Sequence, residues 1–140
     1  MPLKRNRRRP IYTTDEFGDA IVMVPLKDGT EGPYATCFAH DYQYLTDILG
    51  FNPHWCIDDN YYAPYLWYVR TDEKTQVLIK RKIFIARLIM DAHAGEVIRH
   101  IDGDRLNNKA TNLVIARSKA GKDRPRELTN FHRDVLLNAP

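Results

Sequence analysis

The chain has 140 residues, of which 44% are hydrophobic and 28% charged, a balance that predicts one soluble globular domain. No apolar run is as long as a membrane span, and no apolar segment follows the basic N-terminus as in a signal peptide. We therefore expect a cytoplasmic protein of the host cell that makes it, with no membrane partner. Two cysteines are too few for a four-thiolate zinc site, and we expect Cys37 and Cys56 to be free thiols.

The formal net charge of +3 is unevenly distributed. Residues 1–9 contain five basic side chains and no acid, namely Lys4, Arg5, Arg7, Arg8 and Arg9. Residues 10–116 contain ten basic and fifteen acidic side chains, and the remaining residues six basic and three acidic ones. Basic ends on an acidic body are typical of proteins that bind a polyanion, although a solvated tail would have the same composition.

In the first half of the chain the sequence predicts short strands and one helix. Residues 1–10 are expected to form a disordered basic arm. Strands are predicted at 20–26, 34–38, 54–57, 65–70 and 76–80, the last two as a hairpin. A helix is predicted over 41–49, because apolar residues recur there at helical spacing and Gly50 follows as a C-cap.

Aromatic residues are dense between Tyr42 and Tyr68. Trp55 and Trp67 fall in predicted strands of a small sheet, where large aromatics usually supply the core, so we expect both to be buried. Stacking on nucleic-acid bases is the alternative. It stays open for Tyr61 and Tyr62.

The second half predicts a helix at 83–92, a strand at 96–100, a polar loop and a strand at 113–115. A helix is then expected to start at Ser118, and another to cover 126–137 after Pro125. This order places His100 at the mouth of a hairpin. An imidazole is well suited to take a proton from water near neutral pH, and nearby carboxylate and amide oxygens can orient it or bind a hard cation.

The loop motif resembles that of a known family. The run His100-Ile-Asp-Gly-Asp-x-Leu-x-Asn108-x-x-x-Asn112-Leu113 is similar to the core motif of phage-type HNH endonucleases, the ββα-metal nucleases of bacteriophages. Residues 84–92 resemble the helix that precedes this motif. Segments starting at Val24, Asp41 and His54 are more loosely similar to the family's N-terminal part, so the likeness covers roughly residues 20 to 121.

The resemblance implies an α+β fold, with a small N-terminal antiparallel sheet and one helix followed by a ββα-metal motif and a C-terminal helix. The corresponding parts are the arm at 1–10, a β-rich subdomain at 11–82, the HNH motif with its leading helix at 83–124, and the last helix at 125–140.

The resemblance also implies a set of roles. His100 corresponds to the general base, Asn112 to the asparagine that fixes the loop, and Asn108 to one that stabilises the hairpin. A divalent cation, Mg²⁺ or Mn²⁺, is expected between the first strand and the closing helix. The chain departs from the family's usual ligands at Ala86, Arg99 and Gly121. The oxygen ligands proposed in their place are those of Asp102, Asp104 and Asp123.

The expected activity is hydrolysis of DNA phosphodiesters. The basic residues expected to contact DNA are Lys4, Arg5, Arg7, Arg8, Arg9, Lys80, Arg81, Lys82, Arg99 and Arg105. Residues 80–82 could instead be a solvated helix start. The alternative function is an HNH fold with a disabled metal site, acting as a DNA-binding or protein-binding regulator or inhibitor with a host or phage protein as partner. A basic RNA-binding protein is a third, weaker option.

Overall fold

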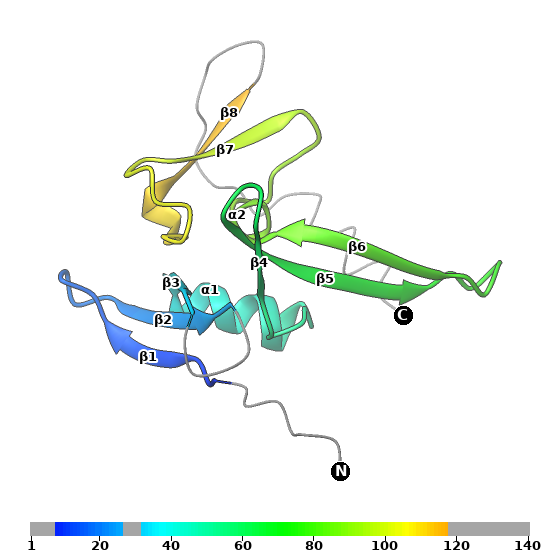
Figure 1. Ribbon diagram of the computed structural model, residues 1–140, viewed down its shortest axis with the longest axis horizontal. Helices are drawn as coiled ribbons and strands as arrows, with labels where there is room; N and C mark the ends of the chain where they lie inside the picture. The colour runs from blue at the N-terminus through cyan, green and yellow to red at the C-terminus, as the bar shows by residue number, and fades with distance from the viewer. Residues whose placement is uncertain (1–7, 27–31, 118–140) are drawn as a thin grey trace.

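The computed structural model describes residues 8–26 and 32–117, which form three small antiparallel sheets and two short α-helices (Figure 1). The strands are β1 (Ile11–Thr14), β2 (Ala20–Pro25), β3 (Tyr34–Phe38), β4 (Cys56–Asp58), β5 (Ala63–Thr71), β6 (Leu78–Phe84), β7 (Glu96–His100) and β8 (Leu113–Arg117). The helices are α1 (Ala39–Gln43) and α2 (Ile85–Met90), with a π-helical turn at Tyr44–Ile48 and a 3-10 turn at Ala110–Asn112. The predicted mixed α+β class is thus confirmed. The helices expected after Ser118 lie outside the described residues.

The first sheet has the order β1-β2-β3. Its inner face is made by alternate residues, as the period of two in a strand requires: Val22 and Val24 on β2, and Ala35 and Cys37 on β3, are all buried. β2 and β3 match the predicted strands. β1 was not predicted, because all four of its residues are exposed and it therefore lacks a buried apolar face.

The predicted helix over 41–49 is present but divided. After α1 the chain widens into the π-helical turn, in which the amide of Leu49 donates to the carbonyl of Tyr44 at 2.9 Å. Leu45 and Leu49 are buried, whereas Ile48 is 63% exposed, because the wider turn rotates it away from the core. Gly50 ends the segment with a φ of 71°, which confirms the predicted glycine cap.

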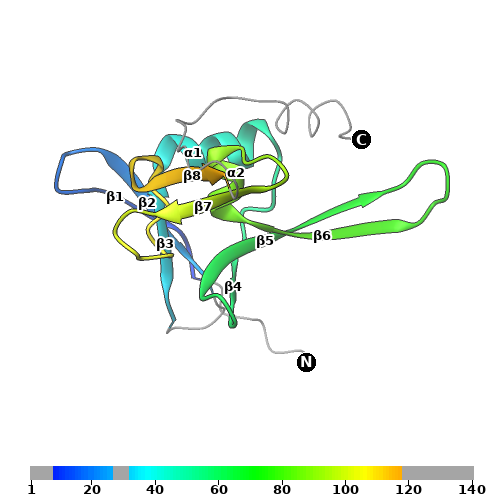
Figure 2. The same ribbon diagram turned by 90° about the horizontal axis from the view of Figure 1, so that it is seen from above.

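The second sheet has the order β4-β5-β6, and its last two strands form a long ribbon that projects from the body (Figure 2). β6 continues to Phe84, so α2 begins two residues later than the predicted helix. The reading of residues 80–82 as a solvated helix start is therefore wrong. They lie within a strand, because β5 offers hydrogen-bonding partners along its whole length.

The two tryptophans differ in burial. Trp55 is 3% exposed and packs edge-on against Tyr42 with ring centroids 5.4 Å apart, as predicted. Trp67 is 37% exposed, and the prediction that it belongs to the core is wrong. Side chains alternate along β5, and Trp67 lies on the opposite face from the fully buried Leu66. Tyr61 and Tyr62 are also exposed.

One hydrophobic core joins all three sheets. It contains Val22 from the first sheet, Leu66 from the second and Ile115 from β8, with the apolar side of α2 among them. The core thus holds the β7–β8 hairpin against the N-terminal half of the chain. Both cysteines are free, Cys37 being buried and Cys56 partly so. Within the described ranges, no helix has the length and apolar character needed to cross a membrane.

Candidate functional site

The β7–β8 hairpin carries the candidate histidine where the sequence predicted it. β7 ends at His100, which pairs with Leu113 at the start of β8. Because side chains alternate along a strand, His100 shares a face with the half-buried Ile98, whereas Arg99 lies on the opposite, exposed face. His100 thus faces the body of the protein, and the neighbouring Arg99 does not.

The imidazole of His100 has a defined partner. Its Nε2 lies 2.9 Å from Oδ1 of Asn108, whose side chain is fully buried. The amide of Asn108 is itself oriented, since its Nδ2 donates to the carbonyl of Arg105 at 3.2 Å. An amide oxygen can only accept a hydrogen bond, so Nε2 must carry the proton. In the neutral ring, Nδ1 then keeps its lone pair and is the nitrogen able to accept a proton.

Asn112 fastens the start of the loop. Its Nδ2 donates to Oδ1 of Asp102 at 2.8 Å and to the carbonyl of Asn107 at 2.9 Å, while its Oδ1 accepts from the amide of Asp102 at 3.1 Å. The main-chain carbonyl of Asn112 also accepts from the amide of Ile101 at 2.8 Å. Asn112 is buried, and its bonds close the loop directly after His100.

The two aspartates of the loop direct their oxygens to the loop itself. Oδ1 of Asp102 accepts from the amide of Asp104 at 2.8 Å, and Oδ2 accepts from the side-chain amide of Asn107 at 2.9 Å. Oδ1 of Asp104 accepts from the amide of Leu106 at 2.9 Å. Hydrogen bonds from Asn107, from the Asp104 amide and from Asn112 lower the pKa of Asp102 below its ordinary value. Both aspartates therefore act as acceptors that shape the turn.

These residues alone do not fit a divalent cation. In the described part of the chain, no group of three or more His, Cys, Asp or Glu side chains comes close enough to hold a metal ion. Asp123 and Gly121, which belong to the predicted closing helix, lie outside the described residues. Ala86, one of the positions at which the sequence departs from the HNH motif it resembles, lies beside His100, since both line one pocket.

The loop is also bound to the first sheet. The amide of Thr36 on β3 donates to the carbonyl of Leu106 at 2.8 Å, and the carbonyl of Thr36 accepts from the amide of Asn108 at 2.7 Å. Nearby, Nζ of Lys109 lies 3.4 Å from Oδ2 of Asp15, with both side chains largely buried. Main-chain hydrogen bonds therefore attach the loop to β3. They hold Asn108 in position beside His100.

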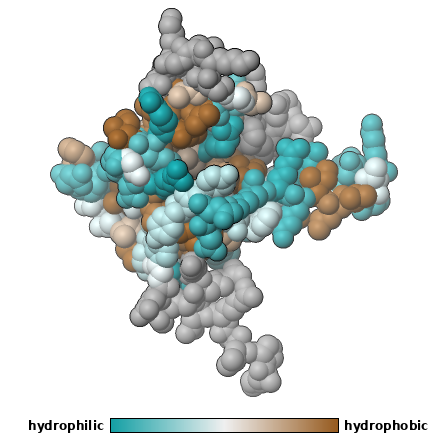
Figure 3. All heavy atoms as spheres, turned by 45° about the horizontal axis from the view of Figure 1, so that its top comes forward, coloured by the Kyte–Doolittle hydropathy of each residue, from teal (hydrophilic) through white to brown (hydrophobic). Residues whose placement is uncertain are grey.

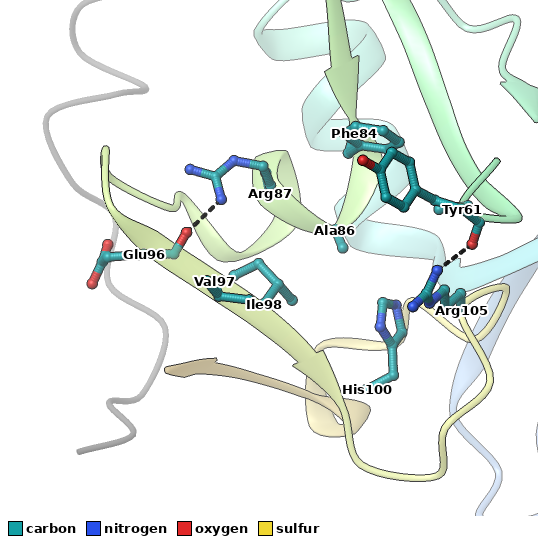
Figure 4. A pocket seen from close by; sticks show the side chains of 10 residues that line it. Tyr61, Phe84, Ala86, Arg87, Glu96, Val97, Ile98, His100 and Arg105 are labelled. Atoms are coloured by element: carbon teal, nitrogen blue, oxygen red, sulfur yellow. Dashed lines mark hydrogen bonds between the residues drawn. The ribbon is translucent and has the colours of Figure 1, made fainter. Parts of the chain in front are cut away.

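A pocket of about 360 Å³ opens beside His100 (Figure 4). Its wall is partly apolar and partly polar, and consists of Tyr61, Ala63, Phe84, Ala86, Arg87, Glu96, Val97, Ile98, His100 and Arg105. Arg105 donates to the carbonyl of Tyr61, which closes one side of the pocket. At the other end Arg87 donates to the carbonyls of Glu96 and His93 at 2.6 and 3.0 Å. The pocket thus combines an oriented imidazole with two guanidinium groups.

The structure brings some of the predicted site residues together and separates others. His100 is hydrogen-bonded to Asn108, Asn112 is hydrogen-bonded to Asp102 in the same loop, and Arg105 lines the His100 pocket. Residues 80–82 lie on the ribbon instead. Of the predicted basic arm, Arg8 donates to the carbonyl of Gly32 at 3.1 Å and lies over the ring of Tyr34 at 4.7 Å. Lys4, Arg5 and Arg7 lie outside the described residues.

Several residues of the site were not predicted. Thr36 acts through its main chain, so no side-chain pattern could have indicated it. For Tyr61 the sequence left open whether the ring packs in the core or stacks on bases. In the structure it lines the His100 pocket. Phe84 is the last residue of β6 and Arg87 lies in α2, and no sequence pattern linked either of them to His100.

Comparison with known proteins adds no further assignment. No protein-family model matches this chain, and neither does any curated protein or solved structure.

Proposed function

We propose that this protein is a phage-type HNH endonuclease-like protein that hydrolyses DNA phosphodiesters with His100 as the general base. The observation that supports this most strongly is the bond between Nε2 of His100 and the buried Oδ1 of Asn108. A general base needs an unprotonated nitrogen in a fixed orientation, and this bond assigns that role to Nδ1.

The pocket supports an anionic substrate. Arg87 and Arg105 bring two permanent positive charges to the wall that His100 shares, and a guanidinium matches the geometry of a phosphate group. The apolar side of the pocket, including Phe84 and Ala86, could receive a sugar or base edge. A phosphodiester placed here would have its charge opposed by arginine and a proton acceptor at hand.

The proposed hydrolysis includes a divalent cation. A divalent cation such as Mg²⁺ or Mn²⁺ would supply positive charge to the scissile phosphate and its leaving oxygen. Asp102 and Asp104 are engaged within the loop, so ligands would have to come at least partly from the chain after Arg117, where Asp123 is the candidate.

A second function is favoured by a separate observation. Ala86 lines the His100 pocket without a side-chain metal ligand, the guanidinium of Arg99 is not a metal ligand, and the loop carboxylates are engaged. This arrangement suits an HNH fold that has lost its metal and serves as a DNA-binding or protein-binding regulator or inhibitor. A host or phage protein is then the alternative partner, and the cytoplasm of the host cell is the proposed location in both cases.

Plasmid nicking with Mg²⁺ or Mn²⁺ separates the two functions. We expect the natural protein to relax supercoiled DNA and His100→Ala to lose the activity. The variant should still melt cooperatively, at a cost of about 1–3 kcal/mol for the unpaired amide oxygen of Asn108. His54→Ala, at an exposed histidine outside the pocket, is the matched control. Equal nicking by His100→Ala would remove His100 from the mechanism, and no nicking by the natural protein would favour the regulator.

A further inference from the structure

The β5–β6 ribbon has two faces of different composition. Residues paired across an antiparallel ribbon share a face. One face contains the fully buried Leu66 and so meets the body. The other, which we call the aromatic–lysine face, contains Tyr65, Trp67, Val69, Lys80, Lys82 and Phe84.

Two lysines of this face lie directly over aromatic rings. Nζ of Lys80 is 4.3 Å from the ring centroid of Trp67, and Nζ of Lys82 is 4.2 Å from that of Tyr65. Both distances are within the range of a cation–π interaction. The rings therefore hold the ammonium groups in place. Each lysine covers one face of its ring, and that face is not available to stack on the bases of a single strand.

The aromatic–lysine face is continuous with the His100 pocket. The rings of Tyr65 and Phe84 are in edge contact at 6.3 Å, and those of Phe84 and Tyr61 at 6.0 Å. Phe84 and Tyr61 line the pocket, and Arg105 binds the carbonyl of Tyr61 at its edge (Figure 4). A row of cations therefore starts at Arg105 and continues through Lys82 to Lys80. Figure 3 shows hydrophilic and hydrophobic side chains interleaved along the projecting ribbon.

We propose that the aromatic–lysine face binds the phosphate backbone of duplex DNA and directs it to the His100 pocket. This inference rests on the proposed function and specifies which surface holds the substrate. A two-stranded ribbon is narrow enough to enter a major groove, where its lysines can reach the backbone. Phosphate contacts of this kind position a protein on DNA without reading its sequence.

The two lysines contribute unequally. Lys82 is paired with the buried Asp58, and that carboxylate raises the pKa of Lys82 while its own is lowered. Part of the charge of Lys82 is thus already opposed. No carboxylate of the described residues pairs with Lys80, whose charge is available to a phosphate. Lys80 is therefore the residue to test.

The test measures binding to a short labelled duplex by fluorescence anisotropy in EDTA, over a range of salt, on two unrelated sequences. Lys80→Gln should make the slope of log K against log salt shallower by about 0.9, the value for one lost phosphate contact, on both sequences alike. Arg70→Gln is the matched control, because it removes the same charge from the opposite face of the ribbon, at the residue that pairs with Ile79 beside Lys80. Its slope should equal that of the natural protein.

Trp67 is expected to act as a positioning residue. Trp67→Leu should weaken binding by about two- to fivefold at each salt concentration, the equivalent of an exposed cation–π pair, while the slope is kept because Lys80 remains. Trp67→Phe should restore most of the affinity. If the rings instead stacked on bases, Trp67→Leu would impair single-stranded DNA more than duplex, and the proposal would be overturned.

The outcomes separate this inference from the nuclease proposal. Lys80→Gln and Arg70→Gln with equal slopes, in a protein that still binds and nicks DNA, would overturn the role of this face alone. A shallower slope for Lys80→Gln only, in a protein that never nicks DNA, would support the face and overturn the proposed hydrolysis. A protein that binds no duplex at low salt would overturn both.

Discussion

Asn112 and Asp102 hold each other by two contacts, one to the carboxylate at 2.8 Å and one from the Asp102 amide at 3.1 Å. This reciprocal pair fixes the residue two positions after His100. The path of the chain directly after β7 therefore depends on Asn112, whereas the hydrogen bond of the imidazole is to Asn108.

Asn112→Ala should consequently reduce both stability and activity. The change leaves the Asp102 amide and the Asn107 carbonyl without their partners, at a cost of about 1–3 kcal/mol. Chemical denaturation and plasmid nicking would measure the two effects. The matched control is Thr111→Ala, at the exposed neighbouring position. If Asn112→Ala melts and cleaves like the natural protein, the loop does not depend on this side chain.

Asn108→Leu should affect catalysis more than DNA binding. Leucine has a similar volume but offers no oxygen to Nε2 of His100, so the ring loses its orientation and its preferred tautomer. Misplacement of a catalytic group by about 1 Å can cost up to about 100-fold in rate. We expect slower nicking with unchanged affinity for duplex DNA. A variant that nicks at the natural rate would show that the bond to Asn108 does not orient the base.

The pH dependence of stability should include a contribution from Asp102. Hydrogen bonds lower its pKa from the ordinary value of 3.8, so the ionised carboxylate stabilises the folded state. The contribution is complete above that value and disappears as the pH falls through the lower folded-state pKa. Asp102→Asn should thus lower the melting temperature near neutral pH, and the difference should shrink in acid. A difference that is constant with pH would contradict this role.

Much of this site followed from the order of residues along the chain. The β-branched run before His100 and the apolar run after Asn112 are local signals, and strand pairing between such close segments needs little tertiary information. The bond from Asn108 to Thr36 was inaccessible, because it joins main-chain atoms of segments far apart in the sequence. The exposure of Trp67 was mispredicted for a related reason. Its strand projects past the body, and nothing local to the residue encodes where the body ends.

Adding metal ligands at positions 99 and 121 tests directly whether the protein can bind a divalent cation. Arg99→Asp together with Gly121→Asn should raise the affinity for Mn²⁺ and the rate of nicking above those of the natural protein, if ligand loss alone weakens the site. Isothermal titration with Mn²⁺ and a nicking assay would measure both. Arg99→Ala with Gly121→Ala, which removes the charge without adding a carboxylate or an amide at either position, is the control. Equal cation affinity in the two double variants would favour the regulator.

The N-terminal basic residues should contribute to binding without contributing to sequence preference. Residues 1–9 contain five basic side chains and no acid. Deleting residues 1–9 should make the slope of log K against log salt shallower by roughly 2 to 4, if about half or more of these charges reach phosphates. Affinity should fall similarly on unrelated sequences. An unchanged slope would mean that these residues do not contact DNA, and a protein partner would become the stronger hypothesis.

The bonds between Thr36 and the loop limit how far this motif can be transplanted. A fragment covering residues 83–117 would retain His100, Asn108 and Asn112 and would look complete in sequence. It would lack Thr36. The carbonyl of Leu106 would then lose its donor on β3, and the amide of Asn108 would lose its acceptor there. The hairpin is therefore one part of a composite unit, and grafting it onto another scaffold would require an exposed strand edge in the position of β3.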